Sequence, residues 1–520
     1  MLKQNWLRPV RIILAIFIFG GFLLLFSDIK AKLSTWLYTS YTATQFLPAI
    51  MKLLSVHTLV SISFLFIILL TLFSGRVYCS VFCPLGIMQD AIAFLLRILP
   101  FKKKRRRFKK ALDYLRYPIL GLFLVSMIFL GFLSINWLDP YANFGRIAAN
   151  IYQPVYILLH NFLANILNAI GLQGLQPLAM KLFTPVTFVT SISMFLLILV
   201  LVIYRDRLYC NTICPVGTIL GLLSRVSFLK IRINKGSCTI CGNCQTVCKA
   251  NCINLKEQTV DMSRCVACFN CITSCEESAI GYIRKSIPVK KGENYDKSKR
   301  DFIRAGMLFL GAAPILANAA NGNENIEHQG KRFCTRGPIS PPGSRSIEEF
   351  KEYCIACQLC ISACPSKVLQ PAFLEYGFTG MMFPRMDNNS GFCNFECTKC
   401  GEVCPTGAIQ KLTKKEKETV QIGTVQFRQK LCIVESEGTA CGSCSEHCPT
   451  QAVYMVPYKG DLTIPEVNPE ICVGCGACEY ACPVEDPHVA IFVYPHEVHK
   501  VAKKPVIKEL EVEEMEDFPF

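Results

Sequence analysis

Four long apolar runs organise the first part of the sequence. They cover residues 10–26, 56–74, 118–134 and 187–204, and contain only one Asp, Glu, Lys or Arg between them. Each run has 17 to 19 residues, close to the length that an α-helix needs to cross a bilayer core of about 30 Å. Four such runs are unusual for the core of a soluble protein, so the pattern predicts a four-helix membrane domain within residues 1–230.

The basic residues between these runs are distributed unevenly. Residues 76–116 contain eleven Lys and Arg, including the run 102–107, whereas residues 135–186 contain two. Since Lys and Arg are enriched in cytoplasmic loops, we expect 76–116 and both ends of this domain to face the cytoplasm. This clustering beside apolar helices accounts for the net charge of +16 without nucleic acid as a partner. The apolar segment 155–172 is expected to lie on the membrane or on the bundle.

A repeat follows the second and fourth runs. The sequence reads GRVYCSVFCPLG at residues 75–86 and DRLYCNTICPVG at residues 206–217. Two helical hairpins that each end in CxxxCP predict a pseudo-symmetric membrane unit. Cysteines four residues apart share a helix face, and the proline after them fits a helix start or break. The aligned residues are Arg76, Tyr78, Cys79, Cys83, Pro84 and Gly86 with Arg207, Tyr209, Cys210, Cys214, Pro215 and Gly217.

The sequence leaves the role of the four CxxxCP thiols open. Brought together by the pseudo-symmetry, Cys79, Cys83, Cys210 and Cys214 would bind a further metal centre or act as redox thiols near a quinone. The alternative is that they are packed thiols at a tight turn at the membrane edge. Motifs and spacing alone identify no catalytic residue beyond these thiols.

Cysteine dominates the chemistry of the rest of the chain. The sequence has 30 cysteines, and 24 of them form repeated runs close to CxxCxxCxxxC. This is the spacing of 4Fe-4S ligands, in which three thiolates of a run bind one cube and the fourth reaches the neighbouring cube. Zinc ribbons use isolated CxxC pairs, and disulfide scaffolds lack this regularity, so we prefer six 4Fe-4S clusters to either alternative.

Residues 231–290 are predicted to form a two-cluster ferredoxin domain. Lys249 and Glu276 stand where the bacterial pattern has proline, and Cys252 is surplus to the two runs. We assign Cys238, Cys241, Cys244 and Cys275 to one cluster, and Cys265, Cys268, Cys271 and Cys248 to the other.

Residues 334–495 are predicted to form a four-cluster polyferredoxin domain. Each of its runs ends in a cysteine followed by proline, the long gap from Cys432 to Cys441 indicates a loop insertion, and Cys334 is a singleton. The sequence does not indicate which runs exchange their fourth cysteine. The ligands are Cys354, Cys357, Cys360, Cys364, Cys393, Cys397, Cys400, Cys404, Cys432, Cys441, Cys444, Cys448, Cys472, Cys475, Cys478 and Cys482.

Six clusters in one chain indicate a one-electron relay, because the potentials of such clusters are tuned by ligation, burial and hydrogen bonding. The sequence has no Rossmann glycine fingerprint, no Walker A loop and no CxxCH haem attachment. We therefore expect an α-helical membrane bundle with α+β bacterial-type ferredoxin domains, and no enzyme centre is evident beyond electron transfer.

These motifs carry a resemblance to known families. Residues 1–290 resemble the NapH-type quinol dehydrogenase membrane subunits, within a wider group that includes NosR-type and CcoG-type membrane iron–sulfur proteins. Residues 298–495 resemble the NapG/MauM-type ferredoxins, which begin with a twin-arginine signal and carry four 4Fe-4S clusters. The matching features there are SKRDFIR at 298–304, the PPG at 341–343 and the four cysteine runs. The chain is thus similar to a fusion of the two.

The segment 298–320 is then expected to be an internal, signal-like membrane anchor. It allows three outcomes: a fifth helix, cleavage near Ala317-Asn318-Ala319, or no insertion. We favour the fifth helix, which predicts a multi-pass protein of the cytoplasmic membrane with its four-cluster domain on the periplasmic side. The tail 496–520 ends in ELEVEEMEDFPF, an acidic end or partner contact.

The resemblance implies that electrons from a quinol of the membrane pool pass through the clusters to an extracytoplasmic reductase or a soluble electron carrier. His57, Asp139 and Tyr141 are candidates to accept the protons of the quinol. Two other functions remain open. The CcoG-like and NosR-like relatives suggest an accessory factor that reduces a metal or maintains another oxidoreductase, and electrons could flow in reverse from a cytosolic ferredoxin to quinone.

Overall fold

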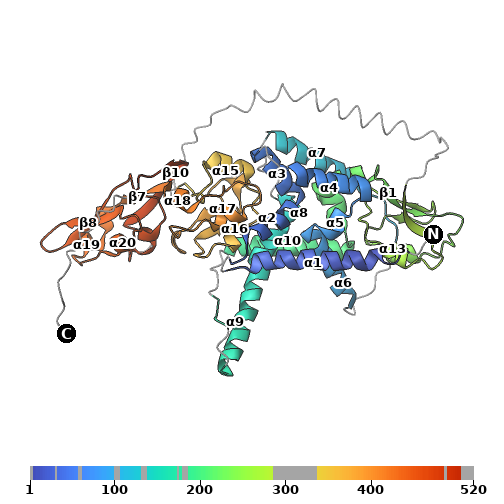
Figure 1. Ribbon diagram of the computed structural model, residues 1–520, viewed down its shortest axis with the longest axis horizontal. Helices are drawn as coiled ribbons and strands as arrows, with labels where there is room; N and C mark the ends of the chain where they lie inside the picture. Colours follow the sequence, from blue (N-terminus) through green and yellow to red (C-terminus); the bar gives the residue numbers. More distant parts are fainter. Residues whose placement is uncertain are drawn as a thin grey trace, which may run out of the picture.

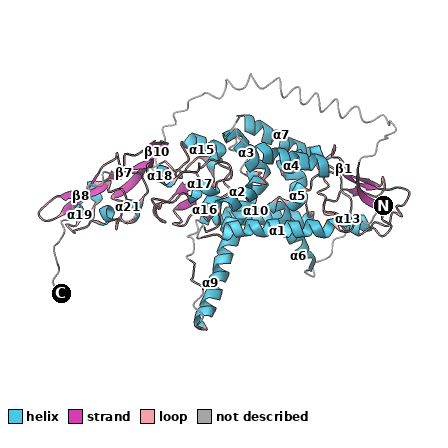
Figure 2. Ribbon diagram, in the orientation of Figure 1, coloured by secondary structure: helices cyan, strands magenta, loops and turns pink. Residues whose placement is uncertain are grey.

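The structure is a computed structural model in which a helical body lies between two cysteine-rich blocks along one long axis (Figures 1 and 2). We call residues 4–228 the helical body, 229–284 the first cysteine block and 337–504 the second cysteine block. The structure describes residues 4–29, 32–56, 61–98, 106–129, 137–171, 175–178, 185–284, 337–484 and 489–504.

Several expected features lie outside the described residues. They are His57, the anchor at 298–320, Cys334 and the acidic end of the tail. Their predictions therefore stay as the sequence left them.

The helical body has more elements than the four expected helices. The long apolar runs give the long helices, and shorter helices fill the space between them (Figure 2). Its elements are α1 (Leu7–Ser27), α2 (Thr35–Ala43), α3 (Phe46–Val56), α4 (Ser61–Ser74), α5 (Tyr78–Val81), α6 (Pro84–Ile98), α7 (Asp113–Phe129), α8 (Pro140–Ile147), the π-helix η2 (Ala148–Tyr152), α9 (Gln153–Ala169), α10 (Pro185–Tyr204), the π-helix η3 (Tyr209–Ile213) and α11 (Pro215–Ser224).

Two described helices, Leu7–Ser27 and Thr187–Tyr204, are long and apolar enough to cross a membrane. Only 33% of the apolar stretch of the first helix and 22% of that of the second are buried, so most of their apolar surface faces outward. A soluble protein rarely exposes large apolar patches. The two other expected spans correspond to α4 and α7, which are shorter in the described part of the chain. A bundle of four full spans is therefore not established by the helices alone.

The segment after the third apolar run is not a simple loop. The Asp139 side chain caps α8 by accepting a hydrogen bond from the Ala142 N–H at 2.7 Å, and Pro140 opens the helix. All eight residues of α8 are buried, and the helix continues into the π-helix η2. The short polar-looking stretch is thus a core element between the apolar runs.

The two cysteine blocks consist of very short helices and two-stranded antiparallel sheets. The sheets pair β1 with β4, β2 with β3, β5 with β6, β7 with β10, and β8 with β9. The elements of the first block are β1 (Leu229–Ile233), α12 (Asn243–Thr246), β2 (Ile253–Asn254), β3 (Thr259–Val260), α13 (Asn270–Thr273) and β4 (Ile280–Arg284). Those of the second block are α15 (Ile347–Tyr353), α16 (Leu359–Ser362), β5 (Leu369–Pro371), η4 (Phe378–Gly380), β6 (Pro384–Met386), α17 (Lys399–Val403), α18 (Lys414–Lys417), β7 (Val420–Phe427), η5 (Gln429–Leu431), α19 (Ile433–Ser436), α20 (Ser443–Glu446), β8 (Val453–Pro457), β9 (Thr463–Val467), α21 (Ala477–Tyr480) and β10 (Ile491–Val501).

Helix α1 runs lengthwise between the two blocks (Figure 1). Just before it, the Gln4 side chain exchanges two hydrogen bonds with the backbone of Tyr282 in the first block, at 3.1 and 2.8 Å. The same helix contacts α16 of the second block. Its 21 residues rise by about 31 Å, so the blocks are separated by about the thickness of a bilayer core.

The second block is docked on the helical body through buried polar contacts. Arg146 Nε donates to the Ala356 carbonyl at 3.3 Å, and Asn150 Nδ2 donates to Gln358 Oε1 at 2.6 Å. Gly145 packs so closely on the run that an added Cβ would overlap the carbonyl oxygen of Cys357. A specific, close-packed interface therefore holds this block in place.

Replacing Gly145 with Ala is expected to weaken this docking, because overpacking typically costs about 1–3 kcal/mol. Thermal unfolding and limited proteolysis of the full chain in detergent should show a lower transition temperature and faster cleavage within the second block. Gly121→Ala in α7 is the control, since its added Cβ meets nothing within 4 Å. Equal behaviour of the two variants would contradict the docking.

Acid is expected to loosen the second block through His499 in β10. Its Nε2 lies 2.9 Å from Ser340 Oγ, and burial, followed by the charge of His496, lowers the pKa of His499 to about 4. The unfolded chain takes up this proton near pH 6.5, so the free energy of unfolding should fall as the pH falls from about 6.5 to about 4, by at most about 3 kcal/mol. In denaturant unfolding, the free energy of unfolding of His499→Gln should depend less on pH over this range than that of the wild type. An equal dependence in the two proteins would show that His499 does not cause the loss of stability in acid.

Candidate functional site

In the first block, the thiols assigned to one cluster surround one cavity. This cavity, of about 130 Å³, is lined by Cys238, Cys241, Cys244 and Cys275. Burial, and then the thiolates of the other three, raises the pKa of the Cys244 thiol to about 11. A bound metal cluster would replace these protons, because metal ligation requires thiolates.

The second assigned set surrounds a neighbouring cavity. Cys248, Cys265, Cys268 and Cys271 line it together with the surplus Cys252. Cys252 is almost fully buried, and its sulfur lies 3.6 Å from that of Cys248. The structure therefore places the fourth cysteine of each run beside the first three cysteines of the other run, as the spacing predicts.

In the second block, the structure places the fourth cysteine of each of the first two runs beside the thiols of the other run. Burial is the main cause that raises the pKa of Cys360, and the thiolates that raise it further are those of Cys357, Cys354 and Cys404. Burial also raises the pKa of Cys400 most, followed by the thiolates of Cys393, Cys364 and Cys397. The sets placed together are thus Cys354, Cys357, Cys360 and Cys404, and Cys393, Cys397, Cys400 and Cys364.

The last two runs are paired in the same way. Burial raises the pKa of Cys478 most, and the neighbouring thiolates that raise it further are those of Cys475, Cys472 and Cys448. The remaining set lines another cavity of the second block. These sets are Cys472, Cys475, Cys478 and Cys448, and Cys432, Cys441, Cys444 and Cys482.

A backbone feature that the sequence did not reveal recurs in four runs. The second and fourth residues after the first cysteine have positive φ, a conformation that is rare without glycine and is retained mainly at functional sites. Turns of this kind direct successive backbone N–H groups into a concavity that suits an anionic group, iron–sulfur clusters included. The pairs are Ile240 and Gly242, Ala267 and Phe269, Ala356 and Gln358, and Gly474 and Gly476.

The donor sets fit multi-iron clusters. Every described cysteine is free of disulfides. Within the described ranges, no three His, Cys, Asp or Glu side chains converge closely enough to hold a single metal ion. Thiols spread around a cavity, with N–H groups turned toward it, suit a cube of several irons.

The CxxxCP thiols meet at the centre of the helical body, and we call Cys79, Cys83, Cys210 and Cys214 the tetrad. All four are at most 4% exposed. Burial is the main cause that raises the pKa of Cys83, and the charges of Cys210 and Cys79 raise it further. Cys210 is also the thiolate that raises the pKa of Cys214 most. The pseudo-symmetry therefore brings the two motifs together.

Two buried arginines connect the repeats reciprocally. Arg76 Nη2 donates to the Cys210 carbonyl at 3.0 Å, and Arg207 Nη1 donates to the Cys79 carbonyl at 2.9 Å. Gly86 and Gly217 leave room for this crossing, since a Cβ on either would overlap the Cys79 or Cys210 carbonyl oxygen, respectively. The aligned residues of the repeat thus build one pseudo-symmetric centre.

The first block joins this centre through Asp90 and Lys249. The Asp90 carboxylate forms ion pairs with Arg207 and Lys249, both at 2.9 Å, and with Arg11 at 3.2 Å. Lys249 is one of the two residues that replace the proline of the bacterial pattern. Its ammonium group therefore docks the run on the helical body, a function that proline could not serve.

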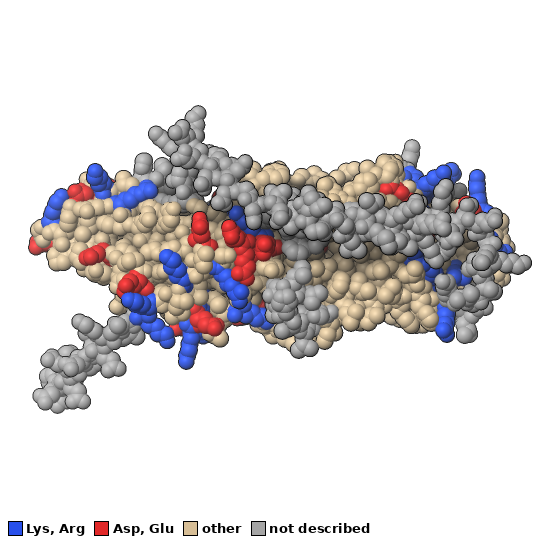
Figure 3. Space-filling view, turned by 90° about the horizontal axis from the view of Figure 1, so that it is seen from above, with Lys and Arg blue, Asp and Glu red and all other residues tan. Residues whose placement is uncertain are grey.

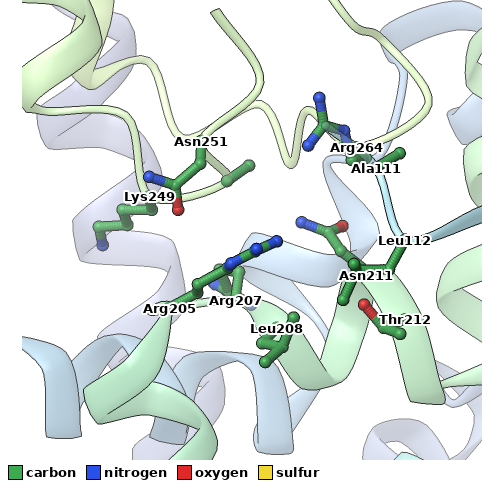
Figure 4. Close-up of a pocket in the computed structure, with 11 residues that line it drawn as sticks. Ala111, Leu112, Arg205, Arg207, Leu208, Asn211, Thr212, Lys249, Asn251 and Arg264 are labelled. Atoms are coloured by element: carbon green, nitrogen blue, oxygen red, sulfur yellow. The ribbon is translucent and has the colours of Figure 1, made fainter. Parts of the chain in front are cut away.

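Basic side chains line a pocket at this junction (Figure 4). Arg205 and Arg207 come from the segment that follows α10, and Lys249 and Arg264 come from the first block. Positive charge favours the thiolate over the thiol, so this junction suits anionic cluster ligands on both sides of it.

One continuous apolar core extends from the first block through the tetrad to the second block. It contains Val266 and Cys268 at one end and Cys354 and Cys364 at the other. Helix α8 lies between tetrad and second block, since Asn143 Nδ2 donates to Tyr209 Oη at 3.0 Å while Gly145 packs on Cys357. The described part of the chain thus places three groups of thiols in succession.

Of the three candidate proton acceptors, the structure describes two. Burial raises the pKa of Asp139 to about 7, against the effect of the N–H groups that it caps. Tyr141 is 1% exposed, and within the described part of the chain its hydroxyl has no hydrogen-bond partner. Both lie on the α8 segment, near the second block.

Two protein families match parts of the chain. A family described as a 4Fe-4S binding domain matches residues 56–106 and 187–236, so each match contains one CxxxCP motif. A family described as a 4Fe-4S dicluster domain matches residues 439–485. No solved structure matches the chain.

Three curated relatives are ferredoxin-type proteins. The methylamine utilization ferredoxin-type protein MauM of Methylophilus methylotrophus is 32% identical over 211 residues, which are 39% of this chain and 89% of the relative. The ferredoxin-type protein NapG of Escherichia coli K12 is 28% identical over 29% of this chain and 69% of its own length. The ferredoxin-type protein NapF of the same organism is 27% identical over 28% and 80%, respectively.

Removing the charge of Asp90 is expected to separate the first block from the helical body. Asp90→Asn leaves buried cations without their carboxylate, which typically costs about 3–5 kcal/mol. Denaturant unfolding and hydrogen exchange of residues 229–284 should show the loss. Glu257→Gln, at an exposed position of the same block, is the control, and equal protection in the two variants would show that Asp90 does not hold the block.

Proposed function

Because the chain belongs to the family of ferredoxin-type iron–sulfur proteins that includes MauM, we propose that it is a membrane-bound conduit that carries single electrons across the bilayer. The donor is a quinol of the membrane pool, and the acceptor is a reductase or soluble electron carrier outside the cytoplasm. The observation that carries this proposal is the position of the two cysteine blocks at opposite ends of α1 (Figure 1).

The surface supports a membrane around the helical body. On the face in Figure 3, charged side chains gather toward the two ends, and the described surface between them is almost free of charge. Helix α9 projects sideways from the body (Figure 1). Its residues Leu159 and Phe162, and Ile170 directly after it, are 64–68% exposed. An apolar helix across the direction of the spans suits the interface of the bilayer, on the side of the second block.

The orientation follows from charge. The basic segment 76–116 favours the cytoplasm, and it contacts the first block through Arg106 and Arg116. The first block then lies in the cytoplasm and the second block outside it. Residues 285–336 connect them and contain the proposed fifth span.

The chain's own residues hold and insulate the relay. The 24 run cysteines supply the ligands of six 4Fe-4S clusters, and the tetrad supplies a further metal centre between the two blocks. When bound, such clusters supply one-electron carriers whose potentials depend on burial and hydrogen bonding. The continuous apolar core excludes water along the path, and Arg76 and Arg207 compensate the negative charge of the tetrad thiolates.

Quinol oxidation also requires a proton acceptor. Asp139 is our candidate, because a carboxyl group whose pKa is raised to about 7 can take up and release protons at neutral pH. It lies at the start of α8, at the end of the helical body that carries the second block. Protons released there would leave on the outer side.

Topology tests the conduit directly. Reporters fused after Lys290 and after Gly330 should differ, with the first active only inside the cytoplasm and the second only outside it. If both report the cytoplasm, all the thiol sites face inward, the transmembrane conduit is excluded and an inward-facing accessory role gains support.

Iron analysis tests the tetrad. Cys79→Ala with Cys214→Ala should lower the iron content by one centre and slow electron transfer between the blocks, while the signals of the other clusters persist. The control is Cys252→Ala, which removes a buried thiol that we place outside the ligand sets. Unchanged iron and unchanged transfer in the tetrad variant would identify these residues as packed thiols.

A further inference from the structure

Tyr141 occupies an unusual position at the contact between the helical body and the second block. It lies on α8 and is 1% exposed, and its hydroxyl has no hydrogen-bond partner among the described residues. A buried hydroxyl without a partner is costly, and native structures rarely retain one. A missing partner that is part of the functional protein would explain it.

The surroundings indicate where this partner lies. Two neighbours of Tyr141 on α8 touch the first run of the second block, since Gly145 packs on the Cys357 carbonyl and Arg146 donates to the Ala356 carbonyl. Burial is the main cause that raises the pKa of the Tyr141 hydroxyl. The charges that raise it further belong to Cys357, Asp139, Cys404 and Cys360. Three of these four groups belong to a single ligand set.

We propose that Tyr141 donates its hydroxyl hydrogen bond to a sulfur of the 4Fe-4S cluster held by Cys354, Cys357, Cys360 and Cys404. This inference rests on the proposed function, because it requires the cluster. The proton stays on the Tyr141 oxygen and no covalent bond forms or breaks. A hydrogen bond to a cluster sulfur stabilises the more negative, reduced state and therefore raises the reduction potential.

The proposal has a structural consequence. The ligands of this cluster come from the second block, whereas the donor comes from the helical body. The reduction potential of the cluster is therefore set only when the two parts are docked, so the first acceptor outside the bundle is tuned by the bundle itself.

Tyr376 provides a matched control. It is also buried, at 3% exposure, and the thiolates of Cys354 and Cys360 act on it as well. Its hydroxyl, however, already donates to the Pro384 carbonyl at 3.2 Å. Tyr141→Phe and Tyr376→Phe thus remove the same atom near the same thiols, but only the first removes the proposed bond to the cluster.

The test is a redox titration of the full chain in lipid nanodiscs, followed by electron paramagnetic resonance. In Tyr141→Phe, the reduction potential of one cluster should fall. At a fixed solution potential, the ratio of oxidised to reduced cluster should rise about tenfold, which corresponds to a shift of about 59 mV for one electron. The other clusters should not move, and Tyr376→Phe should titrate as the wild type. Wild-type titration of Tyr141→Phe with full iron content would overturn the inference and leave the proposed function intact.

A second variant covers the case in which Tyr141→Phe fails to fold. Site-specific 3-fluorotyrosine at position 141 keeps the shape and strengthens the donor, so the potential of the same cluster should rise. An unchanged potential in this variant would contradict the hydrogen bond. Absence of 4Fe-4S signals from the iron-loaded wild type would instead refute the proposed function.

Discussion

The reciprocal hydrogen bonds of two buried arginines determine how the centre of this protein is built. A guanidinium group is tolerated away from water only where other polar groups replace its hydration. Arg76 and Arg207 find those groups on the opposite repeat, at the carbonyls of Cys210 and Cys79. Neither CxxxCP motif can therefore reach its final structure alone, and the tetrad forms only when the two hairpins are paired.

The same interactions connect the centre to its surroundings. Arg76 also donates to the Ser263 carbonyl, and Arg207 pairs with the carboxylate that binds Lys249. The first block is thus held by the groups that hold the tetrad. On the other side, α8 contacts both Tyr209 and the run of Cys357. Changes at the centre should consequently affect the stability of both blocks.

Much of this arrangement follows from spacing, because cysteine runs and repeated motifs constrain which thiols can meet. The pairing within 238–275 is an example, since two runs allow one exchange. Four runs allow several, and each fourth cysteine of the second block is followed by proline, so only the chain path distinguishes the pairs. The positive φ values at Ile240, Phe269 and Gln358 were equally hidden, because these side chains do not indicate a left-handed backbone.

The buried helix α8 could have been expected in part. Asp139 and Pro140 form a recognisable helix start, but an eight-residue helix with polar side chains carries no apolar run that would predict burial. Its position depends on partners distant in the sequence, such as Ala356 and Tyr209.

The docking of the second block also bears on how the protein matures. Cys354, Cys357, Cys360 and Cys364 are all buried, and the helical body covers the run that contains them. Once docked, these thiols are out of reach of any iron–sulfur carrier protein. Under the proposed function, metal insertion therefore precedes docking, and a chain that docks too early would be trapped without its cofactor. The same proposal makes biogenesis an ordered process, in which docking is the last folding step and encloses the metal.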